Sequence, residues 1–163
     1  MIKIRPIKPS ESVAAKRIIY RVAQEIFNDK RSLDEMIEIF ESHGELRDMD
    51  DIQKGYFENG GIFLVMTHND QIIGTGAIRK FEDKTCELKR LWVLTEYHSR
   101  GLGYRMIQEL LAFARTKGYE RIRLETDPVY QKRAVEFYKR IGFSEVPIAN
   151  ATDDEDILME MQL

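Results

Sequence analysis

Two glycines near the middle of the chain, Gly101 and Gly103, lie between a strand-like run and a helix-like pattern. Residues 88–94 form a mostly apolar run that includes one aromatic and one β-branched residue. The apolar residues after the glycines recur at helical spacing: Met106, Ile107, Leu110, Leu111 and Ala114. A helix start leaves amide N–H groups unpaired, and glycine lets a ligand approach them closely. The pattern predicts a phosphate site, although a plain strand-to-helix turn explains two glycines equally well.

Two sequence blocks carry a family resemblance. The block His98-Ser-Arg-Gly-Leu-Gly103 resembles the Gln/Arg-x-x-Gly-x-Gly/Ala signature of the GNAT superfamily, the acyl-CoA-dependent N-acetyltransferases. The block Gln131 to Phe143 resembles the family's Asn-x-x-Ala-x-x-Phe-Tyr-x-x-x-Gly-Phe helix. His98 replaces the usual Gln or Arg, and Gln131 replaces the usual Asn. We take the resemblance to cover the whole chain, 1–163, as a single N-acetyltransferase-like domain.

The resemblance implies acetyl-CoA as the co-substrate. The loop and the helix start would hold the pyrophosphate, and the strand 87–93 would pair with the pantetheine arm. The cofactor-binding residues that it implies are Trp92, Val93, His98, Ser99, Arg100, Gly101, Leu102, Gly103, Tyr104, Gln131 and Ala134. Backbone amides near Trp92 and Val93 would polarise the thioester carbonyl. Four nearby basic side chains could also pair with the phosphates: Arg100, Arg105, Lys132 and Arg133.

Two residues are candidates for proton transfer. The resemblance implies that Tyr138 is the acid that reprotonates the departing thiolate, since an ordinary phenol with a pKa of about 10 stays protonated at neutral pH. Its competing role is packing on the apolar face of its helix. Glu87 is the best candidate for the general base, which takes a proton from the amine directly or through a water. Its competing role is a surface ion pair with Lys89.

Strict strand alternation divides the residues of this strand between two faces. It places Glu87 with Lys89, Leu91 and Val93, and opposite them Cys86, Leu88, Arg90 and Trp92. Lys89 or Arg90 could bind a substrate carboxylate, but alternation lets only one of them face the site. Cys86 is expected to be a small buried strand residue, because no His or Asn has an assignable partnership with it. The three histidines lie on unrelated segments without ligand spacing, so no metal site is predicted.

The elements predict an α+β fold, with a mixed, mostly antiparallel sheet flanked by helices. Strands are expected at 2–5, 62–67, 71–81, 85–94, 121–126, from 143, and at 157–163. Helices are expected after an N-cap at Ser10, after the Ser32-x-x-Glu35 capping box, weakly over 48–57, from Gly101, and over 131–141. The strands 85–94 and 121–126 are joined through a helix and should therefore be parallel. The resemblance adds that these two strands splay apart to admit the cofactor.

Composition narrows the expected partners. A net charge of −3 argues weakly against nucleic acid, and no apolar run approaches the roughly 20 residues that span a bilayer. The lone Cys86 and the absence of an apolar leader favour a cytoplasmic protein. The expected partner is a small-molecule amine or a peptide, with no nucleic acid and no membrane, and with a homodimer as one possible assembly.

The resulting interpretation is transfer of an acetyl group from acetyl-CoA to a primary amine by direct attack in a ternary complex. A non-catalytic acyl-CoA-binding sensor is the alternative, since it would keep the glycine loop but would need neither Tyr138 nor Glu87. Acceptor specificity is expected in residues 20–60 and 147–156, which carry no motif that names the acceptor. The acidic run 153–156 could attract a cationic amine, but a solvated turn is the favoured explanation.

Overall fold

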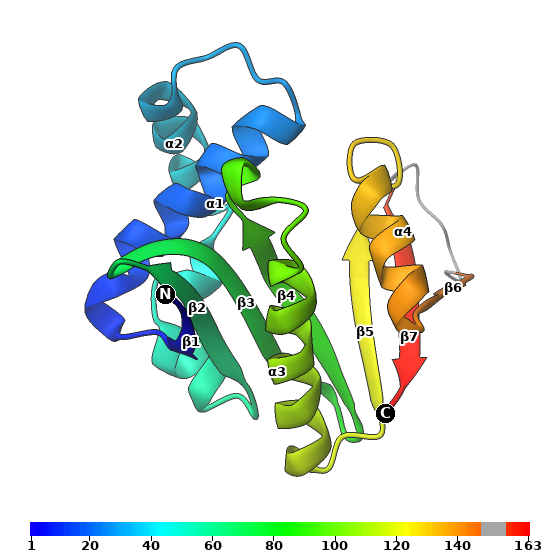
Figure 1. The fold of residues 1–163 in the computed structure, drawn as a ribbon. Coiled ribbons are helices and arrows are strands. Elements are labelled where there is room, and N and C mark those ends of the chain that lie inside the picture. The colour runs from blue at the N-terminus through cyan, green and yellow to red at the C-terminus, as the bar shows by residue number, and fades with distance from the viewer. Residues whose placement is uncertain (148–155) are drawn as a thin grey trace.

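A computed structural model describes residues 1–147 and 156–163 (Figure 1). One seven-stranded sheet runs in the order β1-β2-β3-β4-β5-β7-β6. Its strands are β1 (Ile2–Pro6), β2 (Ile62–His68), β3 (Gln71–Glu82), β4 (Thr85–Val93), β5 (Arg121–Thr126), β6 (Ser144–Val146) and β7 (Ile157–Gln162). The α-helices are α1 (Ser12–Ile26), α2 (Leu33–Ser42), α3 (Leu102–Lys117) and α4 (Lys132–Ile141). The predicted α+β fold is confirmed, while the expected acidic run falls outside the described residues except for Asp156.

The predicted meander of β2, β3 and β4 is confirmed by antiparallel pairing along all three strands. Its first turn, Asn69-Asp70, has positive φ at both residues (51° and 61°), as a tight hairpin turn of the mirror-image type requires. The strands β4 and β5 pair in parallel, as predicted, but only through three positions ending at Glu87 and Arg123. Beyond these positions β4 and β5 diverge, which gives the sheet a V-shaped opening (Figure 1).

Helices cover the two faces of the sheet and bury separate apolar clusters (Figure 1). On one face, α1, α2 and the segment 46–56 pack against β2 and β3, with Tyr20, Tyr56 and Phe63 in the cluster. On the other face, α3 packs so closely that a Cβ at Gly76 would lie 2.8 Å from Met106 and 2.9 Å from Leu110. A glycine at this point of β3 therefore lets the long helix approach the strand.

Two details of the N-terminal half differ from the prediction. Ser10 is not a helix cap, because a 3-10 turn spans Pro9–Glu11 and α1 begins only at Ser12. The Glu11 carboxylate is already held by two 2.8 Å hydrogen bonds from Arg5 and one from the Lys8 amide, which fixes this turn ahead of the helix. The weak helix over 48–57 is a 3-10 turn at Arg47–Met49 followed by a π-turn at Gln53–Phe57. The Ser32 cap is confirmed, since its hydroxyl accepts the Glu35 amide at 3.2 Å.

Candidate active site

The β4–α3 loop forms a concave turn of the backbone. Ser99 and Gly101 both have positive φ, 64° and 72°, and Gly101 is the N-cap of α3. An αL residue followed by a helical one directs successive amides toward a common point, which is the geometry of an anion-binding nest. Glycine adopts this conformation without a Cβ penalty, and the space beside Gly101 is open, with no atom within 4 Å of an added Cβ.

The amides of this loop have no acceptor within the described chain. Residues 99 to 104 donate no backbone hydrogen bond, the Gly101 cap is not made by a side chain, and the first helical bond runs from Arg105 to the Gly101 carbonyl at 3.1 Å. A run of unpaired donors at the positive end of a 16-residue helix is suited to binding an anion. The loop therefore provides the donors that a pyrophosphate would require.

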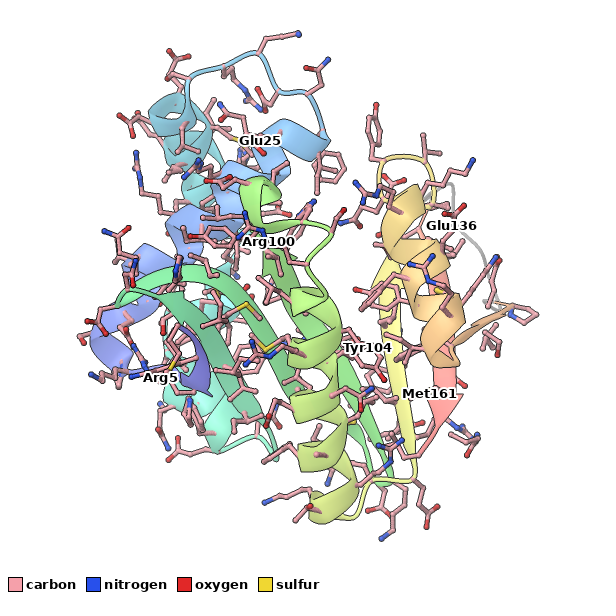
Figure 2. The ribbon with its side chains drawn as sticks, viewed as in Figure 1. Arg5, Glu25, Arg100, Tyr104, Glu136 and Met161 are labelled. Carbon is pink, nitrogen blue, oxygen red and sulfur yellow. The ribbon has the colours of Figure 1, made fainter. Side chains whose placement is uncertain are left out.

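This loop lies against α4, across the V-shaped opening. A Cβ on Gly103 would lie 3.7 Å from the Phe137 ring, and the Arg133 guanidinium reaches the Ser99 hydroxyl at 3.5 Å. Arg100 stacks on the Tyr97 ring at 5.1 Å, so its side chain is held beside the loop (Figure 2). Leu102 is buried. Tyr104, which Figure 2 labels, is 54% exposed on the first turn of α3.

The backbone of β4 presents Val93 to the open edge. Leu94 donates to the Ile73 carbonyl at 2.9 Å, and Gly74 pairs with Val93, so the N–H and C=O of Val93 point away from β3. Trp92 instead pairs with Thr75, and its backbone faces β3. The Nε2–H of His98 donates to the Val93 carbonyl at 2.7 Å. Of the two amides named for the thioester, only that of Val93 faces the opening.

A β-bulge at Arg90 changes which side chains share a face. Arg90 has φ of 56°. Lys89 pairs with Ala77 and Trp92 pairs with Thr75, so β4 has one more residue than β3 between these two pairs. Trp92 and Lys89 therefore lie opposite Thr75 and Ala77 on one face, while Val93 moves to the other. The assignment of Val93 to the face of Glu87, and of Arg90 and Trp92 to the opposite face, is wrong because strict alternation cannot anticipate an inserted residue. Lys89 and Arg90 therefore share one face, contrary to the expectation that only one of them could do so.

Arg90 is anchored by a carboxylate on the segment that covers this face. Its Nε donates to Asp48 Oδ2 at 3.1 Å, and its Nη2 donates to Asp48 Oδ1 at 2.5 Å. The Tyr56 hydroxyl also donates to Asp48. Burial raises the pKa of Asp48, but the hydrogen bonds and charge of Arg90, helped by the Tyr56 hydroxyl, outweigh it and leave that pKa lowered. No motif or spacing in the sequence singles out Asp48.

Glu87 lies at the last paired position before β4 and β5 separate, and it is only 8% exposed. Arg79 donates to its Oε1 at 3.1 and 3.2 Å, and Arg123 approaches its Oε2 at 3.6 Å. The expected surface pair of Glu87 with Lys89 does not form. Parallel pairing of β4 with β5 is the signal that could have found Arg123, because it places that residue beside Glu87.

Tyr138 is buried on α4 and packs against the rings of Phe137 and Phe143, each with a centroid distance of 5.6 Å. Its hydroxyl makes no hydrogen bond with any residue in the described ranges, and burial raises its pKa above the ordinary value of 10. Gln131 is the N-cap residue of α4, and its Oε1 accepts the Thr126 hydroxyl at 2.9 Å rather than an amide of the helix. Ala134 is partly buried on the same helix.

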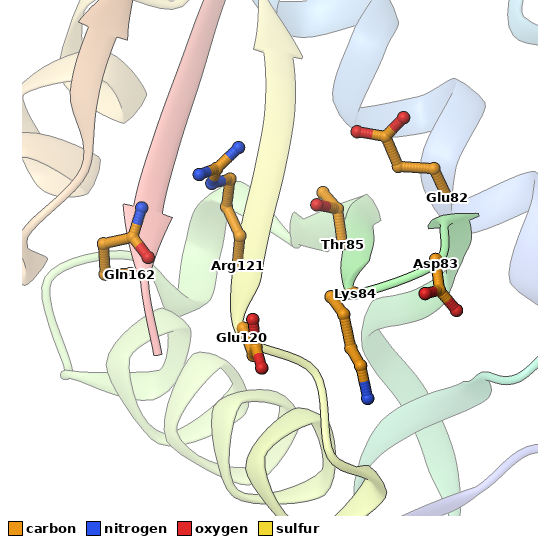
Figure 3. Close-up of a pocket in the computed structure, with 7 residues that line it drawn as sticks. All are labelled: Glu82, Asp83, Lys84, Thr85, Glu120, Arg121 and Gln162. Atoms are coloured by element: carbon orange, nitrogen blue, oxygen red, sulfur yellow. The ribbon is translucent and has the colours of Figure 1, made fainter.

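Other features lie away from this constellation. Cys86 is fully buried, and burial raises the pKa of its thiol to about 12. Within the described ranges, no three His, Cys, Asp or Glu side chains are grouped to hold a metal ion. No helix in those ranges has both the length and the apolar character needed to cross a membrane. A hollow of about 300 Å³ lies at the opposite end of β4 and β5, between the β3–β4 turn and Gln162 (Figure 3).

The sheet opens between two parallel strands, and free amides lie at the start of the adjoining helix. This arrangement is the one that the resemblance to the GNAT superfamily implies. The Acetyltransferase (GNAT) family model matches residues 21–143, and the chain belongs to this family. The fold is that of an acetyltransferase from Streptococcus agalactiae 2603, with a TM-score of 0.80, 22% identity, and coverage of 99% and 98% of the two chains. PaiA N-acetyltransferase from Thermoplasma acidophilum, solved in complex with coenzyme A, gives a TM-score of 0.79, with 18% identity and coverage of 100% and 99%.

Sequence relatives carry acetyltransferase names. Human N-acetyltransferase 8B is 31% identical over 102 residues, which are 59% of this chain and 44% of that protein. N-acetyltransferase 8F1 from Rattus norvegicus is 33% identical over 101 residues, 59% and 45% of the two chains. The match thus spans less than half the length of these relatives. The family model thus places the chain among the GNAT acetyltransferases, and the solved neighbours share its fold.

Proposed function

We propose that the protein transfers the acetyl group of acetyl-CoA to a primary amine of a small molecule or peptide, by direct attack in a ternary complex. The observation that carries this proposal is the run of unpaired amides at residues 99–104, placed where β4 and β5 separate. Membership of the GNAT family and the coenzyme A complex of the T. acidophilum neighbour support acetyl-CoA as co-substrate.

The loop residues would bind the pyrophosphate of acetyl-CoA through their backbone. The donors are the amides from Ser99 to Tyr104, with Arg133 close enough to add a charged contact. The free Val93 edge of β4 offers one donor, and its carbonyl is already held by His98. Acetyl-CoA supplies an activated thioester, and holding it beside the amine can contribute several kcal/mol of the barrier reduction.

Tyr138 and Glu87 would move the protons. A buried phenol with a raised pKa remains a proton donor at neutral pH, as protonation of a leaving thiolate requires. Glu87 lies at the start of the opening, where a carboxylate could receive the amine proton through a water. Because Arg79 and Arg123 both approach this carboxylate, holding the two arginines is its competing role.

Thiol release from acetyl-CoA across amines, amino acids, polyamines and peptides tests the proposal. Calorimetry of coenzyme A binding runs beside it. We expect binding together with acceptor-dependent thiol release. Binding without release for every acceptor would favour the sensor, and absence of binding would contradict both functions.

A further inference from the structure

The loop of unpaired amides at residues 99–104, called the cradle below, and a group of charged residues lie on opposite faces of the sheet, beside the same opening. Helix α3, which begins at the cradle, packs on the face that contains Ile78 and Leu88. Glu87, Lys89 and Trp92 are paired with Arg79, Ala77 and Thr75 and so lie on the other face. An acceptor amine must reach the opening without crossing the bound cofactor, so it would approach from the face of Lys89.

Four cations lie on this face near the opening: Arg79, Lys89, Arg90 and Arg123. Arg79 and Arg123 both lie beside Glu87, and Arg123 also pairs with Glu125 at 2.7 Å. Arg90 is held by Asp48 through two nitrogens. Lys89 has neither an ion pair nor a hydrogen bond with any residue in the described parts of the chain, although its side chain is partly buried.

A partly buried, unpaired ammonium is costly to maintain. Burial and the neighbouring Arg90 guanidinium lower the pKa of Lys89, while Glu87 and Asp48 raise it. The Nε of Arg123 is buried without a hydrogen-bond partner in the described residues, but this guanidinium forms ion pairs with Glu87 and Glu125. Arg79, Arg90 and Arg123 each pair with a carboxylate, so Lys89 is the cation of this group that a bound anion would neutralise.

Building on the proposed acetyltransferase function, we infer that Lys89 binds a carboxylate of the acceptor, so that the preferred substrates are amines carrying a carboxylate, such as free amino acids. Arg79, Arg90 and Arg123 are already paired with carboxylates, so a substrate carboxylate would be attracted to Lys89. Lys89 follows Glu87 by two residues on the same face, which would hold the amine of such an acceptor close to the candidate base. Lys89 would act as a specificity determinant and would take no part in proton transfer.

The test compares free amino acids with their primary amides as acceptors. The amide is intrinsically the more reactive amine, because more of it is unprotonated at neutral pH, so a preference for the acid must come from recognition. The variant is Lys89→Met, with Lys80→Met as the matched control, because Lys80 is an exposed lysine on β3. We expect the wild type to prefer the acids. Lys89→Met should lower the acid-to-amide ratio of kcat/KM by about 10- to 100-fold, mainly through KM.

Two further measurements separate this inference from the proposed function and from a structural role. Calorimetry of free amino acids with the coenzyme A-loaded protein needs no turnover, and the binding heat should disappear in Lys89→Met. The melting temperature should stay level or rise, because the variant removes an unpaired cation. Equal losses on acids and amides, or no preference in the wild type, would overturn the inference and leave acetyl transfer intact. If no acceptor turns over, the proposed function fails, and calorimetry alone decides whether Lys89 binds carboxylates.

Discussion

Replacing Gly103 with Asp should strengthen the fold slightly while severely weakening coenzyme A binding. Gly103 occupies the second position of α3 and has no positive φ, so a side chain there needs no strained backbone. An added Cβ would lie 3.7 Å from the Phe137 ring, which is an ordinary contact. A carboxylate in the first turn of a helix gains about 0.3–1 kcal/mol from the helix dipole, and the loss of glycine adds to this.

The same carboxylate would lie beside the bound pyrophosphate. For unit charges about 5 Å apart at an effective dielectric constant of about 20, the repulsion is about 3 kcal/mol. That energy corresponds to a roughly 200-fold increase in Kd. Because the side chain would also occupy the place of the ligand, Gly103→Asn has the same shape without the charge and measures the steric part.

Calorimetry of coenzyme A with the wild type and both variants gives the affinities, and thermal unfolding gives the stabilities. The Asp and Asn variants should differ by most of the electrostatic factor at about 0.1 M salt. This difference should shrink at about 1 M salt, where the Debye length falls to about 3 Å. A folded Gly103→Asp protein that binds coenzyme A like the wild type would refute the assignment of the loop as the phosphate site.

Three other substitutions test the remaining roles. Tyr138→Phe should reduce turnover by about 10²–10⁴-fold with coenzyme A affinity unchanged, and full activity in steady-state assays would exclude the acid role. Since burial raises the pKa of Tyr138, the wild-type rate should show no basic limb from this group below about pH 10. Glu87→Gln should slow turnover with a loss that shrinks at high pH; a lower melting temperature with a normal rate at every pH would assign Glu87 to holding Arg79 and Arg123. Asp48→Ala should cost about 3–5 kcal/mol in denaturant unfolding, because it leaves Arg90 without its partner. The lowered pKa of Asp48 means that its stabilisation is present above its ordinary pKa of about 4 and is lost as the pH falls further, so wild type and variant should converge in acid.

Much of the fold could be predicted because local patterns agreed with one another. The periodicity after Gly103, the Asn69-Asp70 turn and the helix linking β4 to β5 each specify an element or a pairing from nearby residues. The run of free amides at residues 99–104 could be predicted for the same reason, since these donors belong to the backbone of one short segment. The hydrogen bond from the His98 side chain to the Val93 carbonyl could not be predicted, because it depends on how the loop folds back onto the strand.

The predictions failed where partners are distant in sequence. Asp48 meets Arg90 across 42 positions, and no spacing rule connects a 3-10 turn to a strand so far away. The bulge is a second case, because a positive φ at an arginine has no local signal comparable to a glycine. Tertiary contacts hold Arg90 in this conformation: Asp48 binds its side chain, and the Thr75 hydroxyl donates to its carbonyl at 2.6 Å.

The bulge links the two halves of the proposed site. Without the extra residue, strict alternation would place Val93 on the face of Glu87 and Lys89, and Trp92 with Leu88. With the bulge, Val93 is carried on the α3 face, where the cradle begins, while Lys89 keeps the opposite face. In the proposed site, one inserted residue would let a single strand contact the cofactor on one face and the acceptor on the other. Asp48 fixes that insertion from outside the site, so loss of the Asp48–Arg90 pair should impair use of both ligands together.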